Sequence, residues 1–296
     1  MDSRLNAFLD RAEAVLARLE PLLPTPRVAI DWERCLAARW HREGYGGYLQ
    51  PLEVSLDLRL DDLLGVDRQR EQLARNTRQF VEGLPANHAL LWGARGTGKS
   101  SLVRALLAEH AGAGLRLIEI ERDHLADLPR VVEQLAKLPQ RFVLFCDDLS
   151  FEAGEGDYRV LKSVLDGSLE RAPDNVLLYA TSNRRHLVPE KESDNENWQR
   201  VDGELHPAEA VEDKIALSDR FGLWLSFYPF TQEHFLAVVR HWIGVMAKNA
   251  GLSWDWDEAL EKEAIRWALG RGNRNGRCAY QFARHWVGLQ LLDAQA

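Results

Sequence analysis

Cysteine is scarce in this sequence, and its arrangement argues against two classes of protein. Only Cys35, Cys146 and Cys278 occur among 296 residues. They are odd in number, widely spaced and free of any C-x-x-C pair, so the sequence predicts neither a disulfide framework nor a zinc site. We therefore expect a protein of the reducing cytoplasm.

Long apolar runs are also missing. No run approaches the ~18 residues that a membrane-spanning helix needs, so we expect no membrane partner. The first residues alternate Leu5, Phe8 and Leu9 with charged side chains, which predicts an amphipathic helix rather than the basic start and apolar core of a signal peptide. The formal net charge of −8 disfavours a long, sequence-independent contact with nucleic acid, although it is compatible with a local basic patch.

The most informative segment is 88–107, HALLWGARGTGKSSLVRALL. It carries Gly93, Gly98, Lys99 and Ser100 at the spacing G-x-x-x-x-G-K-S, after an apolar run and before an amphipathic stretch. This order predicts a strand, a phosphate-binding loop and a helix, whereas the plainer alternative is a glycine-rich turn. The glycines let backbone N–H groups point at a polyphosphate, Lys99 would contact the β and γ phosphates, and the Ser100 hydroxyl would bind Mg²⁺.

A second glycine turn precedes this loop. Gly65 and Val66 come directly before Asp67, which stands in a capping position of a predicted helix. Placed before a P-loop strand, such a turn can form one wall of an adenine site, although its residue types alone indicate only a helix start. The predicted ATP-binding residues are Gly65, Val66, Gly93, Ala94, Arg95, Gly96, Thr97, Gly98, Lys99, Ser100 and Ser101.

Strand and helix patterns alternate after the P-loop, which indicates an α/β fold with a parallel sheet. The predicted strands are 115–120, 142–146, 176–181 and 223–228, and the predicted helices between them are 127–138 and 158–171. No strand pattern follows residue 230. We therefore predict an N-terminal helical segment at 1–50, a nucleotide-binding α/β domain at 51–229 and a small helical domain at 230–296.

Polar residues end two of these strands, where ligands bind in open α/β sheets. Asp147 is placed to hold a hydrated Mg²⁺, and Asp148 is placed to orient or deprotonate an attacking water. Asn183 can both donate and accept hydrogen bonds, which suits a group that holds this water. The plainer alternatives are a strand cap for the two acids and a turn residue for Asn183.

Two arginines complete the predicted site. Arg220 lies directly before the last strand, and Arg277 lies at the predicted start of a late helix. A guanidinium is permanently charged and matches phosphate oxygens, so either could stabilise charge on the γ phosphate. An isolated arginine of this kind is more often a surface ion-pair partner.

Together these motifs resemble the AAA+ ATPase module over about residues 52–292. The blocks LLWGARGTGKSSLV, FCDDLSFE, YATSNRRHL and LSDRFGLWL are similar to a bacterial family of predicted AAA+ ATP-binding proteins. The resemblance implies a sheet of order 5-1-4-3-2, a helical lid, Asn183 as sensor 1 and Arg277 as sensor 2. It also implies a homo-oligomer in which Arg220 is an arginine finger that reaches a neighbour's nucleotide.

One residue departs from the family pattern. The second acid of the Walker B motif is usually Glu, and here it is Asp148, which is shorter by one methylene. A small displacement of the water can be costly in rate. Glu152, a few residues on, is an alternative candidate for activating the water.

The segment 189–214 is strongly acidic and has few apolar residues. Such a composition predicts a solvated loop, and the alternative is a partner-binding loop with Trp198 as its contact. The opposite charge recurs at Arg266, Arg271, Arg274, Arg277 and Arg284. As a nucleic-acid patch this set is not favoured, because Arg277 is already assigned to phosphate sensing.

Two functions follow from these residues. The first is an ATPase that uses Mg²⁺ and hydrolyses ATP to ADP and phosphate, with Lys99, Asp148, Asn183, Arg220 and Arg277 as its catalytic set and Ser100 and Asp147 as metal ligands. It would remodel or load an unidentified protein partner. The alternative is an ATP-gated binding module with slow hydrolysis that recruits a partner. A small-molecule kinase is weaker, because no acceptor motif is visible.

Overall fold

The computed structural model describes residues 29–44, 46–149, 173–183 and 220–294, a few isolated positions, and the backbone of two short strands, β7 (Gln199–Val201) and β8 (Glu204–His206). The chain divides into two units, Met1–Asp31 and Trp32–Ala296, and the second contains the fold that follows. The predicted helix at the N-terminus, the predicted helix 158–171, Glu152 and Trp198 lie largely or wholly outside the described residues.

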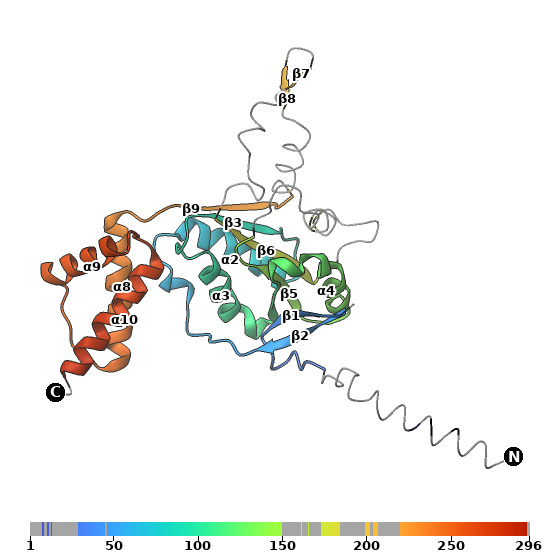
Figure 1. Cartoon of the computed structure of the whole chain (residues 1–296), viewed down its shortest axis with the longest axis horizontal. Helices are drawn as coiled ribbons and strands as arrows, with labels where there is room; N and C mark the ends of the chain where they lie inside the picture. The colour runs from blue at the N-terminus through green and yellow to red at the C-terminus, as the bar shows by residue number, and fades with distance from the viewer. Residues whose placement is uncertain are drawn as a thin grey trace. The chain divides into compact units, whose positions relative to one another are not determined.

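A seven-stranded sheet forms the centre of the second unit (Figure 1). Its order is β2-β1-β4-β5-β6-β3-β9, and every neighbouring pair except β1 and β2 is parallel. The strands are β1 (Ala37–Glu43), β2 (Gly46–Leu52), β3 (Ala89–Gly93), β4 (Leu115–Glu119), β5 (Arg141–Cys146), β6 (Val176–Ser182) and β9 (Leu223–Phe227). The strand predictions from the P-loop onward are therefore confirmed.

The predicted strand order needs one correction. Starting from β9, the five strands from the P-loop onward run fifth, first, fourth, third and second, but the sheet does not end at β4. The prediction of a helical segment at 1–50 is wrong for residues 37–43 and 46–50. They belong to an antiparallel hairpin, 37–43 and 46–52, whose first strand pairs with β4. The fold class, an α/β fold with a mostly parallel sheet and a glycine loop between β3 and the next helix, is otherwise as predicted.

The physical reason for this hairpin is the packing of Trp40. Its side chain is fully buried, and its Nε1 donates to Asp127 Oδ2 at 3.0 Å, an oxygen that also accepts from Arg42 Nε at 2.8 Å. A Cβ on Gly47 would lie 2.2 Å from the Trp40 ring. Gly47 of β2 therefore makes room for the indole.

Helices cover the parallel sheet, and the strands are buried on both faces, as parallel strands usually are. Alternate residues such as Leu91, Val143 and Leu225 share one hydrophobic cluster with α2 (Asp67–Val81) and α3 (Lys99–His110). Leu90 and Leu144 are also fully buried, and they face the opposite side of the sheet. The remaining helical elements of this part are η2 (Leu60–Asp62), η3 (Ala111–Ala113), η4 (Arg122–Asp127) and α4 (Leu128–Leu135).

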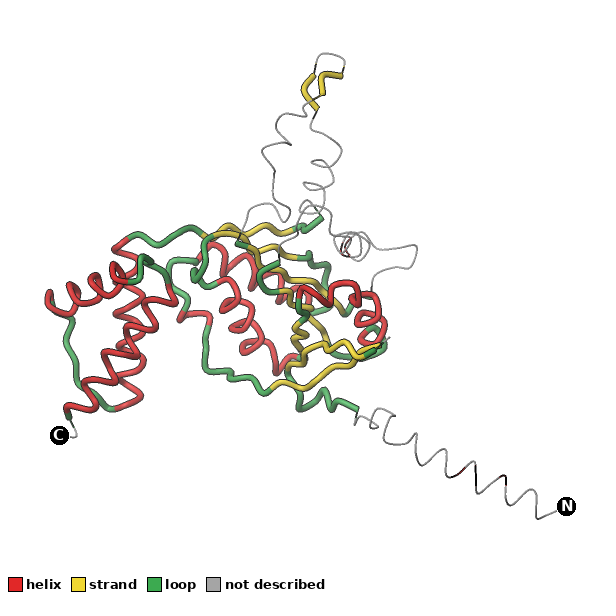
Figure 2. Tube along the Cα trace, viewed as in Figure 1, coloured by secondary structure: helices red, strands yellow, loops and turns green. Residues whose placement is uncertain are grey.

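The chain ends in three helices, α8 (Gln232–Ala250), α9 (Glu258–Gly270) and α10 (Gly276–Asp293), which Figure 2 shows in red. They share a hydrophobic cluster of their own, with Phe235, Ala264 and Phe282 fully buried. Each helix begins with a side-chain cap. Thr231, Asp257 and Asn275 accept hydrogen bonds from the backbone N–H three residues on, which stabilises each helix start by about 1 kcal/mol.

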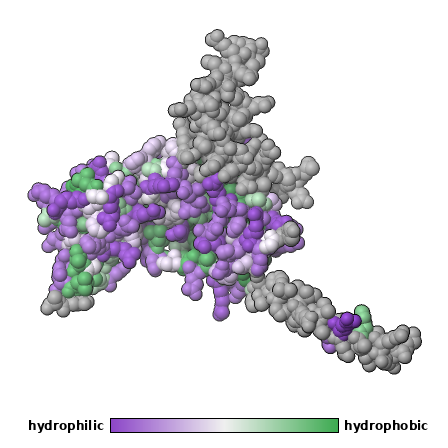
Figure 3. Space-filling view, in the orientation of Figure 1, coloured by the Kyte–Doolittle hydropathy of each residue, from purple (hydrophilic) through white to green (hydrophobic). Residues whose placement is uncertain are grey.

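Hydrophilic residues dominate the face of the described part that Figure 3 shows, with apolar residues in small patches. Within the described residues, no helix combines the length and the apolar composition that crossing a membrane requires.

Candidate nucleotide site

The loop between β3 and α3 has the geometry of a phosphate-binding loop. Gly93, Gly96 and Gly98 have φ angles of 131°, 76° and 103°, which favour glycine. A Cβ on Gly93 would lie 2.0 Å from the carbonyl oxygen of Phe227, and Ala94 N–H donates to that oxygen at 3.0 Å. The end of β9 therefore fixes the start of the loop, and only glycine fits there.

Lys99 lies at the end of this loop, and its side chain is 6% exposed. Its Nζ donates to the carbonyl oxygens of Gly93 and Ala94, both at 2.8 Å, and to Asn183 Oδ1 at 3.4 Å. Burial lowers the pKa of Lys99, Asp147 and Asp148 oppose that shift, and Arg95 adds to it. Within the described residues the ammonium has no ion-pair partner, so an anionic ligand would supply the missing charge.

The hydroxyl of Ser100 meets the end of β5. Ser100 Oγ donates to Asp147 Oδ1 at 2.6 Å, and Thr181 Oγ1 donates to the same oxygen at 2.6 Å. The structure thus brings together the two residues predicted to hold the metal. Thr181, which is 2% exposed, was not predicted.

Asp148 has a left-handed backbone with a φ of 53°, which is uncommon for a residue other than glycine. Its N–H donates to Thr181 Oγ1 at 2.8 Å, and its Oδ1 accepts a hydrogen bond from Asn183 Nδ2. Arg95 lies 3.7 Å from the other carboxylate oxygen, in an exposed pair of little energetic weight. The predicted water-activating acid and the predicted sensor asparagine are therefore in direct contact.

The remaining P-loop residues lie around these groups. Thr97 is buried, and its hydroxyl donates to the carbonyl oxygen of Ala94 at 2.8 Å, which tightens the loop. Ser101 is half-buried in the first turn of α3. Both therefore contribute through the shape of the loop and the helix start.

The start of α10 lies against the P-loop. Asn275 Nδ2 donates to the carbonyl oxygen of Arg95 at 3.2 Å while its Oδ1 caps the helix. The backbone N–H of Arg277 lies 3.4 Å from the carbonyl oxygen of Gly96. The structure therefore places the backbone of the predicted sensor 2 at the loop, whereas a contact between its exposed guanidinium and phosphate remains a prediction. Asn275 was missed because an asparagine before a helix indicates only a cap.

The predicted adenine-side turn lies against the start of α8. Gly65 has a φ of 72°, and a Cβ there would lie 1.8 Å from His234 Nε2. That nitrogen is 2.8 Å from the carbonyl oxygen of Leu64, and the His234 ring stacks on Phe230 at 3.9 Å between centroids. Val66 is buried beside the turn. No pattern in the sequence indicated Phe230 and His234 as neighbours of this turn, because they are remote from it in the chain.

Arg220 lies apart from this cluster. The C-terminal residue of β9, Phe227, pairs with Gly93, and its first residue, Leu223, pairs with Ala89. Arg220 precedes Leu223, so about five strand residues at ~3.3 Å each separate it from the P-loop edge of the sheet. Arg220 therefore lies near the amino ends of the parallel strands, whereas the Lys99 cluster of the same copy lies at their carboxyl ends.

Comparison with known proteins identifies a family and a fold. The family model described as "Protein of unknown function (DUF815)" matches residues 33–290. Two variants of RuvB from Thermotoga maritima have similar structures, with sequence identities of 15% and 16% and TM-scores of 0.50. They match 76% and 77% of this chain, and the matched parts are 63% and 64% of the RuvB chains. At this identity the likeness concerns the fold.

This chain thus spans less than two thirds of the RuvB chains that it matches. No curated protein matches its sequence.

Proposed function

The chain belongs to this family of proteins of unknown function, and we propose that it is a cytoplasmic AAA+ ATPase that binds Mg-ATP and hydrolyses it to ADP and phosphate. In this proposal the energy of hydrolysis remodels or loads a macromolecular partner. One observation carries this proposal, a continuous series of hydrogen bonds through the site. The series runs from Lys99 to the Ser100 hydroxyl through Asn183, Asp148, Thr181 and Asp147. A purely structural turn has no need for such a series.

Binding of the triphosphate follows from the loop and the lysine. The backbone N–H groups at the start of α3 and the positive end of that helix favour a polyphosphate. The Lys99 ammonium is held by two backbone carbonyls. When phosphate oxygens replace these neutral carbonyl acceptors, a negative charge lies next to the buried ammonium.

The groups beside Ser100 fit Mg²⁺. The ion takes oxygen ligands and commonly keeps several waters, so one or two protein oxygens suffice. Ser100 Oγ and Asp147 Oδ1 are adjacent at 2.6 Å, whereas the described residues contain no group of three His, Cys, Asp or Glu side chains that could enclose a metal. When bound, Mg²⁺ neutralises charge on the phosphate oxygens.

Asp148 and Asn183 are the groups that would position the attacking water. The left-handed backbone of Asp148 and the hydrogen bond from Asn183 fix its carboxylate beside Lys99. A carboxylate in this position can accept the proton of a water, and the amide of Asn183 can orient it.

Arg220 has a different proposed role. Arg220 lies near the amino end of β9, away from the P-loop of its own copy. This position suits an arginine finger that completes the site of a neighbouring copy. Arg277, whose backbone meets Gly96, is the proposed sensor of the γ phosphate within its own copy.

A second function, an ATP-gated binding module with slow hydrolysis, is favoured by the state of Asp148. The acid is one methylene shorter than Glu, and Asn183 already occupies its Oδ1. Such a site would bind ATP well and turn it over slowly.

Phosphate release from Mg-ATP, measured as a function of protein concentration, separates the two functions. We expect specific activity to rise with concentration and to vanish in Lys99→Ala and Arg220→Ala. Mixing Arg220→Ala with Asp147→Ala should restore part of the activity, because one arginine finger and one metal site remain in the mixed assembly. Tight ATP binding with background release at every concentration would instead favour the gated module, and unchanged turnover in Lys99→Ala would refute both.

A further inference from the structure

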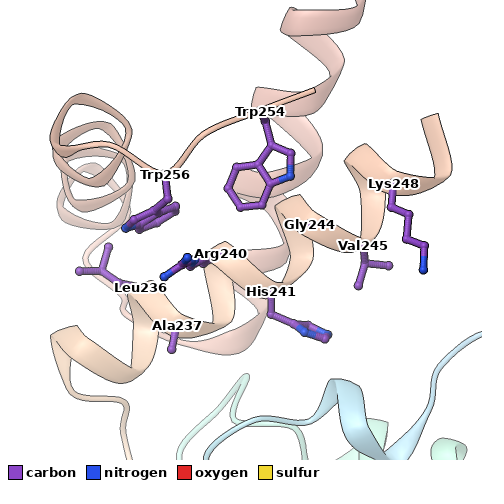
Figure 4. A pocket seen from close by; sticks show the side chains of 9 residues that line it. All are labelled: Leu236, Ala237, Arg240, His241, Gly244, Val245, Lys248, Trp254 and Trp256. Carbon is purple, nitrogen blue, oxygen red and sulfur yellow. The ribbon is translucent and has the colours of Figure 1, made fainter. Parts of the chain in front are cut away.

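A groove on the C-terminal helices shares no residue with the nucleotide site. It has a volume of about 600 Å³ and lies between α8 and the segment that leads to α9 (Figure 4). Apolar residues and Gly244 of α8 line it with two tryptophans, together with Arg240, His241 and Lys248.

The tryptophans form one wall because of the backbone around them. Trp254 and Trp256 are two residues apart in a segment without helix, so their side chains point to the same side. Their rings meet edge to face at 6.5 Å between centroids. A Cβ on Gly244 would lie 3.4 Å from the Trp254 ring, so glycine at this position leaves room for the indole against α8.

The charged groups of the groove are cationic. Arg240 and Lys248 are exposed and lie eight residues apart on α8, which places them about 12 Å apart along the helix axis. Within the part of the chain that the structure describes, neither has a salt bridge or a side-chain hydrogen bond. His241 differs, because its Nε2 lies 3.0 Å from Asp62 Oδ1. Among the residues that the structure describes, no acidic side chain lines the groove.

Two indole rings beside two unpaired cations suit an anionic ligand that also carries an apolar group. Single-stranded nucleic acid fits less well than an acidic peptide. Proteins that grip nucleic acid through phosphates commonly use about six to ten cationic contacts, and this groove offers two in a chain of net charge −8. An extended acidic peptide needs only two carboxylates with an apolar side chain between or beside them.

We propose that the occupant is the acidic segment 189–214 of the same chain. The segment contains nine acidic and three basic residues. Trp198 follows Asp194 and Glu196, so the segment combines carboxylates with an aromatic ring, the chemistry that the groove complements. Segment and groove belong to one chain, so docking within a copy is an intramolecular event, which favours it over binding by another copy when the connecting residues span the distance.

This docking would connect the two halves of the molecule. The segment joins Asn183, at the end of β6, to Arg220, before β9. When the segment binds the groove, the stretch between the predicted sensor Asn183 and the predicted finger Arg220 is attached to α8. The inference does not depend on ATP hydrolysis, because no residue of the groove belongs to the nucleotide site.

A photo-crosslinker tests the proposal in the full chain. Trp198 is replaced by p-benzoylphenylalanine, the protein is irradiated, and crosslinked peptides are identified by mass spectrometry. We expect crosslinks to α8 and to the segment with Trp254 and Trp256. Arg240→Glu should lower their yield by about fivefold, as loss of an exposed ion pair does, and rising salt should lower it further. Arg266→Glu, the same charge change on exposed α9 outside the groove, should leave the yield unchanged.

Mixing isotope-labelled and unlabelled protein identifies the source of the segment. Crosslinks within one copy support the proposal, whereas crosslinks only between labelled and unlabelled copies would replace it with docking of a second copy. Crosslinks that avoid the groove, or a yield insensitive to Arg240→Glu in protein with unchanged circular dichroism, would overturn it. Tight binding of a fluorescent oligothymidylate that Arg240→Glu abolishes would identify nucleic acid as the occupant instead.

Discussion

The two cationic sites of this protein differ in how their charges are held. In the nucleotide site, Lys99 is buried and donates to three acceptors, so its position is fixed before any ligand arrives. In the groove on α8, Arg240 and Lys248 are exposed, and within the described residues neither side chain has a salt bridge or a hydrogen bond. A fixed charge can select one geometry of phosphate, whereas free charges select by sign and tolerate many ligands.

The largest expected effect tests the fixed charge. Lys99→Ala should lower ATP turnover by at least about 10²-fold, because a preorganised cation at a phosphate contributes on the scale of other charge-stabilising groups. Arg104→Ala provides the matched control, since Arg104 is an exposed cation on the same helix. If phosphate release showed equal turnover in the two variants, Lys99 would have no special role at the phosphates, and the proposed difference between a fixed and a free charge would be wrong.

Thr181 tests whether the acids beside Lys99 are fixed as well. Its hydroxyl donates to Asp147 and accepts from the N–H of Asp148, so Thr181→Val should release both acids. We expect turnover to fall by about 10-fold or more and the Mg²⁺ concentration for half-maximal rate to rise, because losing this buried hydrogen-bonding group costs about 1–3 kcal/mol. Thr181→Ser should restore both quantities. A fall in thermal stability with an unchanged Mg²⁺ requirement would reduce Thr181 to a packing role.

His88 extends the comparison to the strand that precedes the P-loop. Burial lowers its pKa to about 4 from 6.5, and its Nδ1 accepts from the N–H of Leu178 at 3.0 Å. Between these pKa values the unfolded chain binds a proton and the folded chain does not, so stability is lost as pH falls from 6.5 toward 4. Urea titrations should show a loss of about 2 kcal/mol between pH 7 and pH 5 from this group. In His88→Asn the dependence should weaken, and an unchanged slope would assign it to other groups.

Asn275 separates a helix cap from a contact with the P-loop. Asn275→Ala and Asp257→Ala each remove one cap and should each lower stability by about 1 kcal/mol. Only Asn275 also donates to Arg95, so only Asn275→Ala should change the affinity for ATP, by about threefold for a lost neutral hydrogen bond. The affinity can be measured with a fluorescent ATP analogue. Equal affinities in both variants would mean that the contact has no part in nucleotide binding.

The smallest effect tests the free charges. Arg240→Glu should leave ATP turnover within about twofold of wild type, because a change of an exposed charge outside a site has little effect on local energies. A larger loss in the phosphate-release assay would show that the groove and the nucleotide site are coupled. The two sites could then not be treated as independent.

Local patterns were enough to predict the glycine loop before α3, the strands that follow it and the closeness of Ser100 to Asp147. Each of these depends on residues that are close in sequence or on the rule that parallel strands end at one edge. Thr181 could not be predicted, because its contact with the two acids depends on the register in which Ala180 pairs with Cys146. The hairpin at 37–52 was missed for the same kind of reason, since Trp40 is satisfied by Asp127, far along the chain.

The hairpin also decides how this molecule avoids unwanted self-association. Unpaired edge strands are templates for aggregation, and β1 covers the edge that β4 would otherwise present. The new outer strand, β2, carries two glycines and Pro51, which lacks a backbone N–H. These residues make β2 a poor template for a further strand, whereas β9 at the other edge reads LWLSF and contains neither glycine nor proline. By composition, β9 is therefore the better template of the two edge strands for a further strand.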